Sequence, residues 1–181
     1  MFAGTALAMQ PLDTPLGPMT AVADEDWLYA LEFSEGGNRR GDVDRLLART
    51  GREMRPGSTG PLESIRAELA EYFAGARTTF ETPVSPFGTD FERSVWRTLR
   101  DVPYGETRSY RDLAVTLDRP AATRAVGRAN GANPLPIVLP CHRIIGSDGS
   151  LCGYGGQLCR KQWLLDHERR TRLAAARREP K

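Results

Sequence analysis

The sequence predicts an α+β protein made of two small domains, and three observations support this. Short apolar runs such as Trp27 to Phe33 favour strands in the first half, whereas capped, periodic segments favour short helices in the second. Between them, residues 82–88 read TPVSPFG, which is typical of a linker. We therefore expect an N-terminal α+β domain at 1–84, a helical domain at 89–168 and a basic tail at 169–181.

The first half shows the features of a scaffold and no catalytic pattern. Residues 36–61 are rich in glycine, arginine and proline, and we expect a long surface loop there with one short helix. From Pro61 to Gly75, apolar residues recur at helical spacing and Gly75 is a suitable stop. We expect this half to play a supporting role.

The second half shows three helix starts in close succession. Thr89 and Ser109 are each followed three positions later by an acidic residue, which is the pattern of a capping box. Pro120 suits the first turn of a third helix, which we expect to end near Gly131. Three short helices with tight connections predict a helix-turn-helix.

The third helix combines small residues with Arg124 and Arg128, which lie four positions apart on one face. Small side chains let a backbone approach a DNA groove while the guanidinium groups reach beyond it. The same side chains also suit a tightly packed core helix with two exposed arginines. The pattern alone does not separate these two interpretations.

Charge is distributed unevenly along the chain. The first 88 residues hold 8 arginines and 13 acidic residues, a net charge of −5, and the remainder carries +7. Such asymmetry is a hint of a polyanion-binding half, although basic runs are more often solvated surfaces.

Composition argues against several classes of protein. No apolar stretch approaches the length of a membrane-spanning helix, and the N-terminus lacks the features of a secretory signal. We therefore expect a soluble, cytoplasmic protein. The 3 cysteines and 2 histidines show no metal-binding spacing, so we expect no metal.

Cys141 is the strongest candidate nucleophile. The segment Ile137 to Leu139 resembles a short buried strand between prolines that delivers Cys141 and His142 at its end. A thiol with an ordinary pKa of about 8.5 needs a nearby base or positive field, and His142 can supply the base. Successive strand residues point to opposite faces, so their contact requires a turn or an intervening water. A buried, inert cysteine beside a structural histidine is the alternative.

The longer segment NPLPIVLPCHRIIGSDGSLCGYGG closely resembles the active-site signature of the O6-alkylguanine-DNA alkyltransferase family. The resemblance extends from about Phe91 to Glu168 through VPYGETRSYRDLA, TRAVGRANGANP and WLLDHE. It implies a ribonuclease H-like N-terminal domain and a winged helix-turn-helix domain that holds the active site. It also implies irreversible transfer of an alkyl group from damaged guanine in double-stranded DNA, without a cofactor, and leaves O4-alkylthymine open as a second substrate.

The resemblance implies a role for each residue of the site. Cys141 matches the alkyl acceptor, His142 the base that reaches the sulfur through water, and Glu168 the carboxylate that orients it. Asn133 matches the residue that steadies the active-site turn. Tyr110 matches a tyrosine that crowds a phosphate, helps to rotate the nucleotide and protonates the departing guanine.

Further positions match residues that contact DNA or line the pocket. Arg124 matches the arginine that enters the minor groove and replaces the flipped base. Weaker matches to DNA-contacting positions are Arg111, Arg119 and Ser147, and Arg128 lies beside Arg124 on the same helix face. The implied pocket walls are Ile144, Tyr154, Gly155 and Gly156. Because Gly155 replaces a serine of some members, we expect a roomier pocket that tolerates alkyl groups larger than methyl.

Three other functions share parts of this pattern: a non-catalytic reader of alkylated DNA, a winged-helix regulator and a thiol hydrolase. A reader would lack the acceptor cysteine, and a regulator needs no set of Cys141, His142, Asn133 and Glu168. A hydrolase turns over because its thioester has an electrophilic carbonyl. A thioether has no such carbon, so we expect a protein that acts once. We expect a monomer, and cooperative binding to DNA is left open.

Overall fold

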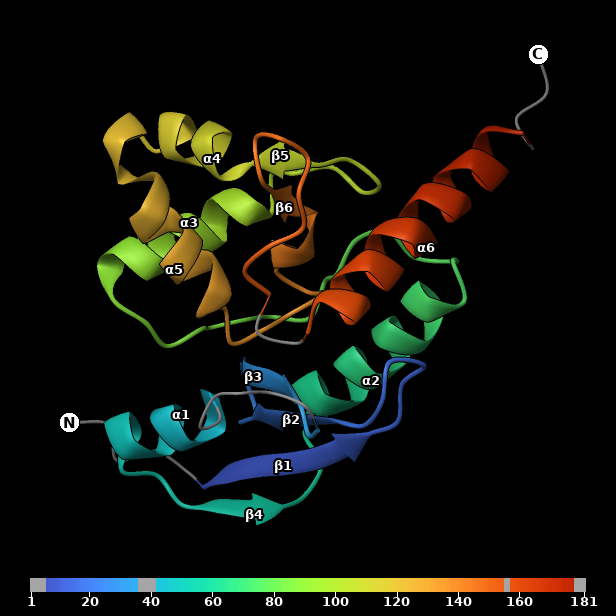
Figure 1. Ribbon diagram of the computed structural model, residues 1–181. Coiled ribbons are helices and arrows are strands. Elements are labelled where there is room, and N and C mark those ends of the chain that lie inside the picture. Colours follow the sequence, from blue (N-terminus) through green and yellow to red (C-terminus); the bar gives the residue numbers. More distant parts are fainter. Residues whose placement is uncertain (1–5, 36–41, 155–156, 178–181) are drawn as a thin grey trace. The chain divides into compact units, whose positions relative to one another are not determined.

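The computed structural model describes residues 6–35, 42–154 and 157–177 (Figure 1). The chain divides into two compact units between Phe87 and Gly88. The first unit is rich in strands and the second is mainly helical. The predicted α+β fold class, with a strand-rich N-terminal unit and a helical C-terminal unit, is confirmed.

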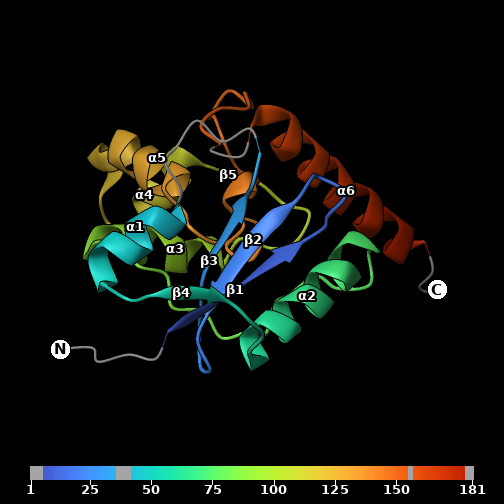
Figure 2. The same cartoon turned by 90° about the horizontal axis from the view of Figure 1, so that it is seen from below.

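A four-stranded sheet forms the centre of the first unit. Its strands are β1 (Leu7–Leu12), β2 (Met19–Ala23), β3 (Leu28–Phe33) and β4 (Met54–Pro56), in the order β3-β2-β1-β4. β1 pairs antiparallel with β2 and parallel with β4, and β2 pairs antiparallel with β3. Helix α1 (Asp42–Thr50) packs against β3, and α2 (Gly60–Phe73) packs against β1 and β2 (Figure 2).

The segment expected to be a surface loop is more ordered than its composition suggested. Helix α1 confirms the one short helix, and Val43 and Leu46 pack on Leu7, Val22 and Tyr29 of the sheet. Strand β4 was not expected, because three residues that include a proline give no recognisable strand pattern. Its pairing is supplied by β1, a partner distant in sequence. Residues 36–41 of the segment lie outside the described residues.

The proline-rich segment 82–88 is largely part of the first unit and not a free linker. Thr82 is buried, and its backbone N–H and hydroxyl donate to the Glu68 carboxylate. Val84 forms a parallel bridge with Leu28, and Phe87 packs against Tyr29. The chain therefore leaves the first unit only at Gly88.

Helices α3 (Asp90–Leu99), α4 (Tyr110–Thr116) and α5 (Thr123–Gly131) form a compact group in the second unit (Figure 1). Both predicted capping boxes are present, Thr89 with Glu92 and Ser109 with Asp112. Pro120 begins a 3-10 turn, η1 (Pro120–Ala122), which leads into α5. Two short strands, β5 (Arg108–Ser109) and β6 (Ile144–Ile145), pair in parallel beside the group.

Trp96 joins α3 to α5. Its ring is buried, and its indole N–H donates to the Ala129 carbonyl at 2.8 Å. The ring also packs so closely on Gly88 that a Cβ there would lie 2.5 Å from it, which excludes any side chain at the start of the unit.

The last helix, α6 (Leu158–Ala176), continues beyond Glu168 into the segment expected to be a basic tail. Its arginines at 169, 170 and 172 are exposed, as is Arg177 directly after the helix. Among the described residues, no helix has both the length and the apolar character needed to cross a membrane.

We predict that Trp96→Phe lowers the free energy of unfolding by about 1–3 kcal/mol, because the Ala129 carbonyl loses a donor and the smaller ring leaves a cavity. Urea unfolding followed by circular dichroism measures this loss. Trp27→Phe is the matched control, since Trp27 is 45% exposed, and it should change stability by less than about 0.5 kcal/mol. Equal effects of the two substitutions would contradict this account of the α3 to α5 junction.

Candidate active site

A tight turn, and not the expected strand, delivers Cys141. Residues 134–139 form bends and turns, and the Leu139 N–H donates to the Leu135 carbonyl at 2.9 Å. Ile137 has a φ of 75°, which β-branched residues rarely adopt. The β-branched, apolar run 137–139 resembles a strand in sequence, but it is buried as a compact turn. The strand prediction is therefore wrong.

Asn133 braces this turn at both ends. Its Oδ1 accepts from the Leu135 N–H at 3.0 Å, and its Nδ2 donates to the Leu139 carbonyl at 2.7 Å. The side chain is buried, so these bonds do not compete with exposed water. The strained backbone at Ile137 is thus enclosed between two hydrogen bonds from one amide.

Cys141 opens a 3-10 turn, η2 (Cys141–Arg143), directly after Pro140. It is buried, whereas Cys152 and Cys159 are exposed. The Asn130 Nδ2 of α5 donates to the Cys141 carbonyl at 3.4 Å. The position of the thiol is therefore set by a turn on one side and by α5 on the other.

Glu168 lies at the centre of a buried network that includes the two residues after Cys141. Its Oε1 lies 2.8 Å from His142 Nε2, and Arg143 donates to both carboxylate oxygens at 2.9 Å. The Gly105 N–H donates to Oε2 at 2.9 Å, and Arg143 also donates to the Val102 carbonyl at 2.6 Å. These hydrogen bonds hold helix α6 against η2 and against the loop before β5.

This network sets the charges of its members. Burial alone would raise the pKa of Glu168, but the hydrogen bonds of His142 and Arg143 and the charge of Arg143 hold the pKa well below the usual range. Burial lowers the pKa of His142, and the charges of Arg143 and Lys161 add to this effect, whereas Glu168 opposes it. Glu168 is therefore ionised, and His142 is neutral at neutral pH.

The hydrogen bond to Glu168 also selects the tautomer of His142. A neutral imidazole has one N–H, and the carboxylate can only accept, so the proton resides on Nε2. Nδ1 is then a lone-pair acceptor. It is buried, and no described residue donates a hydrogen bond to it. The residue next to Cys141 thus presents a proton acceptor that is not otherwise engaged.

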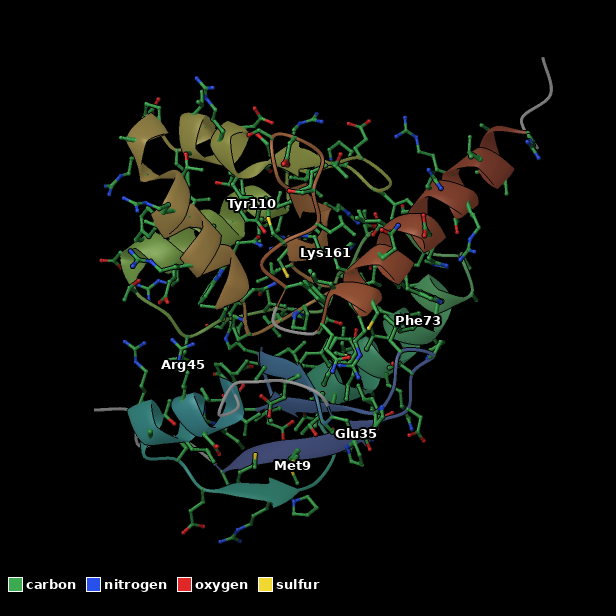
Figure 3. The ribbon with its side chains drawn as sticks, viewed as in Figure 1. Met9, Glu35, Arg45, Phe73, Tyr110 and Lys161 are labelled. Atoms are coloured by element: carbon green, nitrogen blue, oxygen red, sulfur yellow. The ribbon has the colours of Figure 1, made fainter. Side chains whose placement is uncertain are left out.

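Tyr110 and Lys161 meet at the loop that follows β6 (Figure 3). The Tyr110 hydroxyl donates to the Cys152 carbonyl at 2.8 Å, and Lys161 Nζ donates to the same carbonyl at 2.9 Å and to the carbonyl of Ile144. The Lys161 nitrogen lies 5.7 Å from the centre of the Tyr110 ring. Burial raises the pKa of Tyr110 and lowers that of Lys161.

Tyr154 belongs to the same region. Burial raises its pKa well above the usual value, with a further contribution from the charge of Cys141. Its hydroxyl is buried, and no described residue bonds to it. Ile144, the other described residue of the expected pocket wall, is fully buried. Gly155 and Gly156 lie outside the described residues.

The residues expected to contact DNA lie on the surface of the same unit. Arg111 is on α4, Arg124 and Arg128 are on α5, and all three are exposed. Ser147 is exposed in the turn after β6. Arg119 is also exposed, and its guanidinium stacks over the Phe91 ring at 5.6 Å.

Two of the buried cations, Arg143 and Lys161, bond to residues of the site and were not expected from the sequence. Arg143 directly follows His142, but nothing local marks a buried arginine or lysine. Their partners, Glu168 for Arg143 and the Ile144 and Cys152 carbonyls for Lys161, are distant in the chain. Within the described ranges, no group of three or more histidine, cysteine or acidic side chains is placed to hold a metal ion.

Comparison with known families accounts for nearly the whole chain. Residues 7–86 match the family model described as the ribonuclease-like domain of 6-O-methylguanine DNA methyltransferase. Residues 90–170 match the model of the DNA-binding domain of the same family. The two matches fall on either side of the division between Phe87 and Gly88.

Individual relatives agree with the family models. The chain is 52% identical over 165 residues to a methylated-DNA–protein-cysteine methyltransferase of Mycolicibacterium paratuberculosis, covering 88% of this chain and 90% of the relative. It is 43% identical over 164 residues to the protein of the same description from Shigella flexneri, covering 90% and 95%.

Solved structures give the same result. The O6-methylguanine methyltransferase of Mycobacterium tuberculosis matches with a TM-score of 0.77 and 39% identity over 91% of this chain and 94% of that one. The M. tuberculosis OGT in complex with DNA matches with a TM-score of 0.78 at the same identity and coverage. The chain therefore belongs to the 6-O-methylguanine DNA methyltransferase family.

Proposed function

We propose that this chain repairs DNA by moving the alkyl group of O6-alkylguanine onto its own Cys141. Relatives described as methylated-DNA–protein-cysteine methyltransferases, and a structural neighbour in complex with DNA, support the reaction and the DNA partner. The observation that carries the choice of residue is local. Cys141 is the buried thiol of the three, and the next residue is a neutral histidine held by a buried carboxylate.

The transfer comprises loss of the thiol proton, attack on the alkyl carbon and departure of guanine. His142 Nδ1 takes the thiol proton through a water molecule, and the new imidazolium is stabilised by the Glu168 carboxylate on its other nitrogen. The thiolate attacks the alkyl carbon, so that a C–S bond forms as the bond between that carbon and guanine O6 breaks. The guanine leaves as an anion, which Tyr110 protonates. The Tyr110 phenolate then regains a proton from water, and the His142 imidazolium returns the thiol proton to water.

The product explains why the protein acts once and needs no cofactor. A thioether has no electrophilic carbonyl, so water does not release the alkyl group as it releases an acyl group. One chain holds all the groups named above, so a monomer suffices. A thiol nucleophile also requires a reducing compartment, which favours the cytoplasm.

DNA is held by the exposed basic face of α4 and α5. Arg124 and Arg128 lie exposed on one face of α5, from which they reach the DNA, whereas Gly127 and Ala129 pack toward the protein. The target base must leave the stack to reach a buried thiol, and Arg124 fills the space it leaves. A weakly paired lesion flips at lower cost, which contributes to selectivity.

We predict that incubation with duplex DNA containing O6-methylguanine adds one CH2 unit to the intact mass of the protein, saturating at one per chain. Cys141→Ser should show no gain. Cys152→Ser and Cys159→Ser are matched controls, because their thiols are exposed and should not be alkylated by the DNA. Intact-protein mass spectrometry reads all four samples.

Two results would contradict the proposal. Wild type that binds the duplex without a mass change would instead be a non-catalytic reader of alkylated DNA. A gain that persists in Cys141→Ser and disappears in either control would place the acceptor elsewhere.

We predict that Glu168→Gln slows transfer at saturating duplex by about 10²- to 10⁴-fold, the range contributed by a positioned general base. The amide oxygen still accepts from His142 Nε2, but the negative charge that stabilises the imidazolium is gone. Asp166→Asn, at an ion-paired residue nearby on α6, is the control and should transfer like wild type. Quenched-flow measurement of the first-order rate tests this. A folded Glu168→Gln variant with the wild-type rate would exclude Glu168 from the reaction.

A further inference from the structure

Asn130 is a buried polar residue of α5 that the proposed reaction does not yet use. It lies in the last turn of the helix, its side chain is 1% exposed, and it faces away from the exposed Arg124 and Arg128. Its Nδ2 donates to the Cys141 carbonyl at 3.4 Å. It thereby connects the helix that carries the DNA-facing arginines to the main chain of the acceptor.

The same face of α5 also packs against Tyr110. Gly127, one turn earlier on the same face of α5, packs against the Tyr110 ring, where a Cβ would lie 3.7 Å from it. Burial raises the pKa of Tyr110, and the Asn130 side chain has a smaller, opposing effect. Asn130 therefore donates to the main chain of η2 from the face of α5 on which Tyr110 of α4 packs.

The state of the Asn130 Oδ1 atom indicates that the residue acts through its Nδ2 donor. This oxygen is buried and has no hydrogen-bond partner among the described residues. A buried acceptor without a partner is unfavourable, and an apolar side chain of similar size would avoid the penalty. The asparagine is explained by what its Nδ2 holds and not by packing.

We propose that Asn130 is a positioning residue that fixes the Cys141 main chain against α5, on the face of the helix where the Tyr110 ring also packs. The inference rests on the proposed function, in which these groups act at the two ends of the bond that breaks. The thiolate attacks the alkyl carbon, and Tyr110 protonates the departing guanine. Asn130 holds the main chain of the attacking residue at a fixed place on the helix that also supports the Tyr110 ring.

The test compares Asn130→Leu, Asn130→Asp and Val126→Ala for duplex affinity and for the first-order transfer rate at saturating O6-methylguanine DNA. Leucine and aspartate are close to asparagine in size and lack its amide donor. Because Asn130 faces inward, both variants should bind the duplex like wild type. Transfer should slow on the order of 10- to 100-fold, as expected when reacting groups lose their alignment.

Val126→Ala and a pH series separate positioning from general loosening of α5. Val126 is fully buried on the same helix and no polar contact involves it, so its truncation should lower the melting temperature but leave the transfer rate unchanged. A protonated aspartic acid regains a donor, so the rate of Asn130→Asp relative to wild type should rise as pH falls. Lost packing alone predicts no such trend.

The outcomes distinguish this inference from the proposed function. Wild type that transfers no alkyl group overturns the proposed function itself. Wild type that transfers, together with an Asn130→Leu variant of equal rate, overturns only the role of Asn130. Equal slowing in Val126→Ala, or a rate loss explained by weaker duplex binding, also overturns it.

Discussion

The ionised carboxylate of Glu168 has no exposed surface, and most of the active site is organised by what that charge requires. A buried charge is costly unless it is paired and hydrogen-bonded. Here Arg143 supplies a bidentate ion pair, and His142 and the Gly105 N–H supply the remaining partners. Removing one partner of such a buried pair typically costs about 3–5 kcal/mol. The chemistry and the local fold therefore depend on the same interaction.

This coupling explains how a helix near the C-terminus controls a turn formed some 25 residues earlier in the chain. Helix α6 carries Glu168 to His142 and Arg143, and Lys161, two turns earlier on α6, bonds to the carbonyls of Ile144 and Cys152. The turn 133–140 is meanwhile held by Asn133 and α5. Cys141 is thus placed between two independent supports, so its position does not rely on the strained backbone at Ile137 alone.

The sequence predicted those parts of the fold that depend on near neighbours. Both capping boxes and the short helices could be recognised because their signals lie within a few residues. The strand predicted at 137–139 was wrong. The β-branched residues of this segment favour a strand, whereas the Asn133 side chain and the surrounding prolines favour a turn. Strand β4 and the partners of Arg143 could not be predicted, because each depends on a residue far away in the chain.

The candidate site likewise combines residues that the sequence predicted with residues that it did not predict. Cys141, His142 and Glu168 were expected together from the family signature, and the structure brings His142 and Glu168 into contact. Local chemistry gave no reason to include Arg143, Lys161 or Asn130, since a buried cation or amide resembles a surface residue in sequence. Their contacts appear only when α5, α6 and η2 are assembled.

The central claim is that His142 is a neutral base whose proton is held on Nε2 by Glu168, and nuclear magnetic resonance of ¹⁵N-labelled histidine tests it directly. The chain has 2 histidines, so His167→Gln leaves His142 alone in the spectrum. Since burial lowers its pKa, His142 should remain neutral, with its proton on Nε2, at a pH below about 6.5, where an ordinary histidine is already charged. Half-protonation at or above about 6.5, or a proton on Nδ1, would contradict the account.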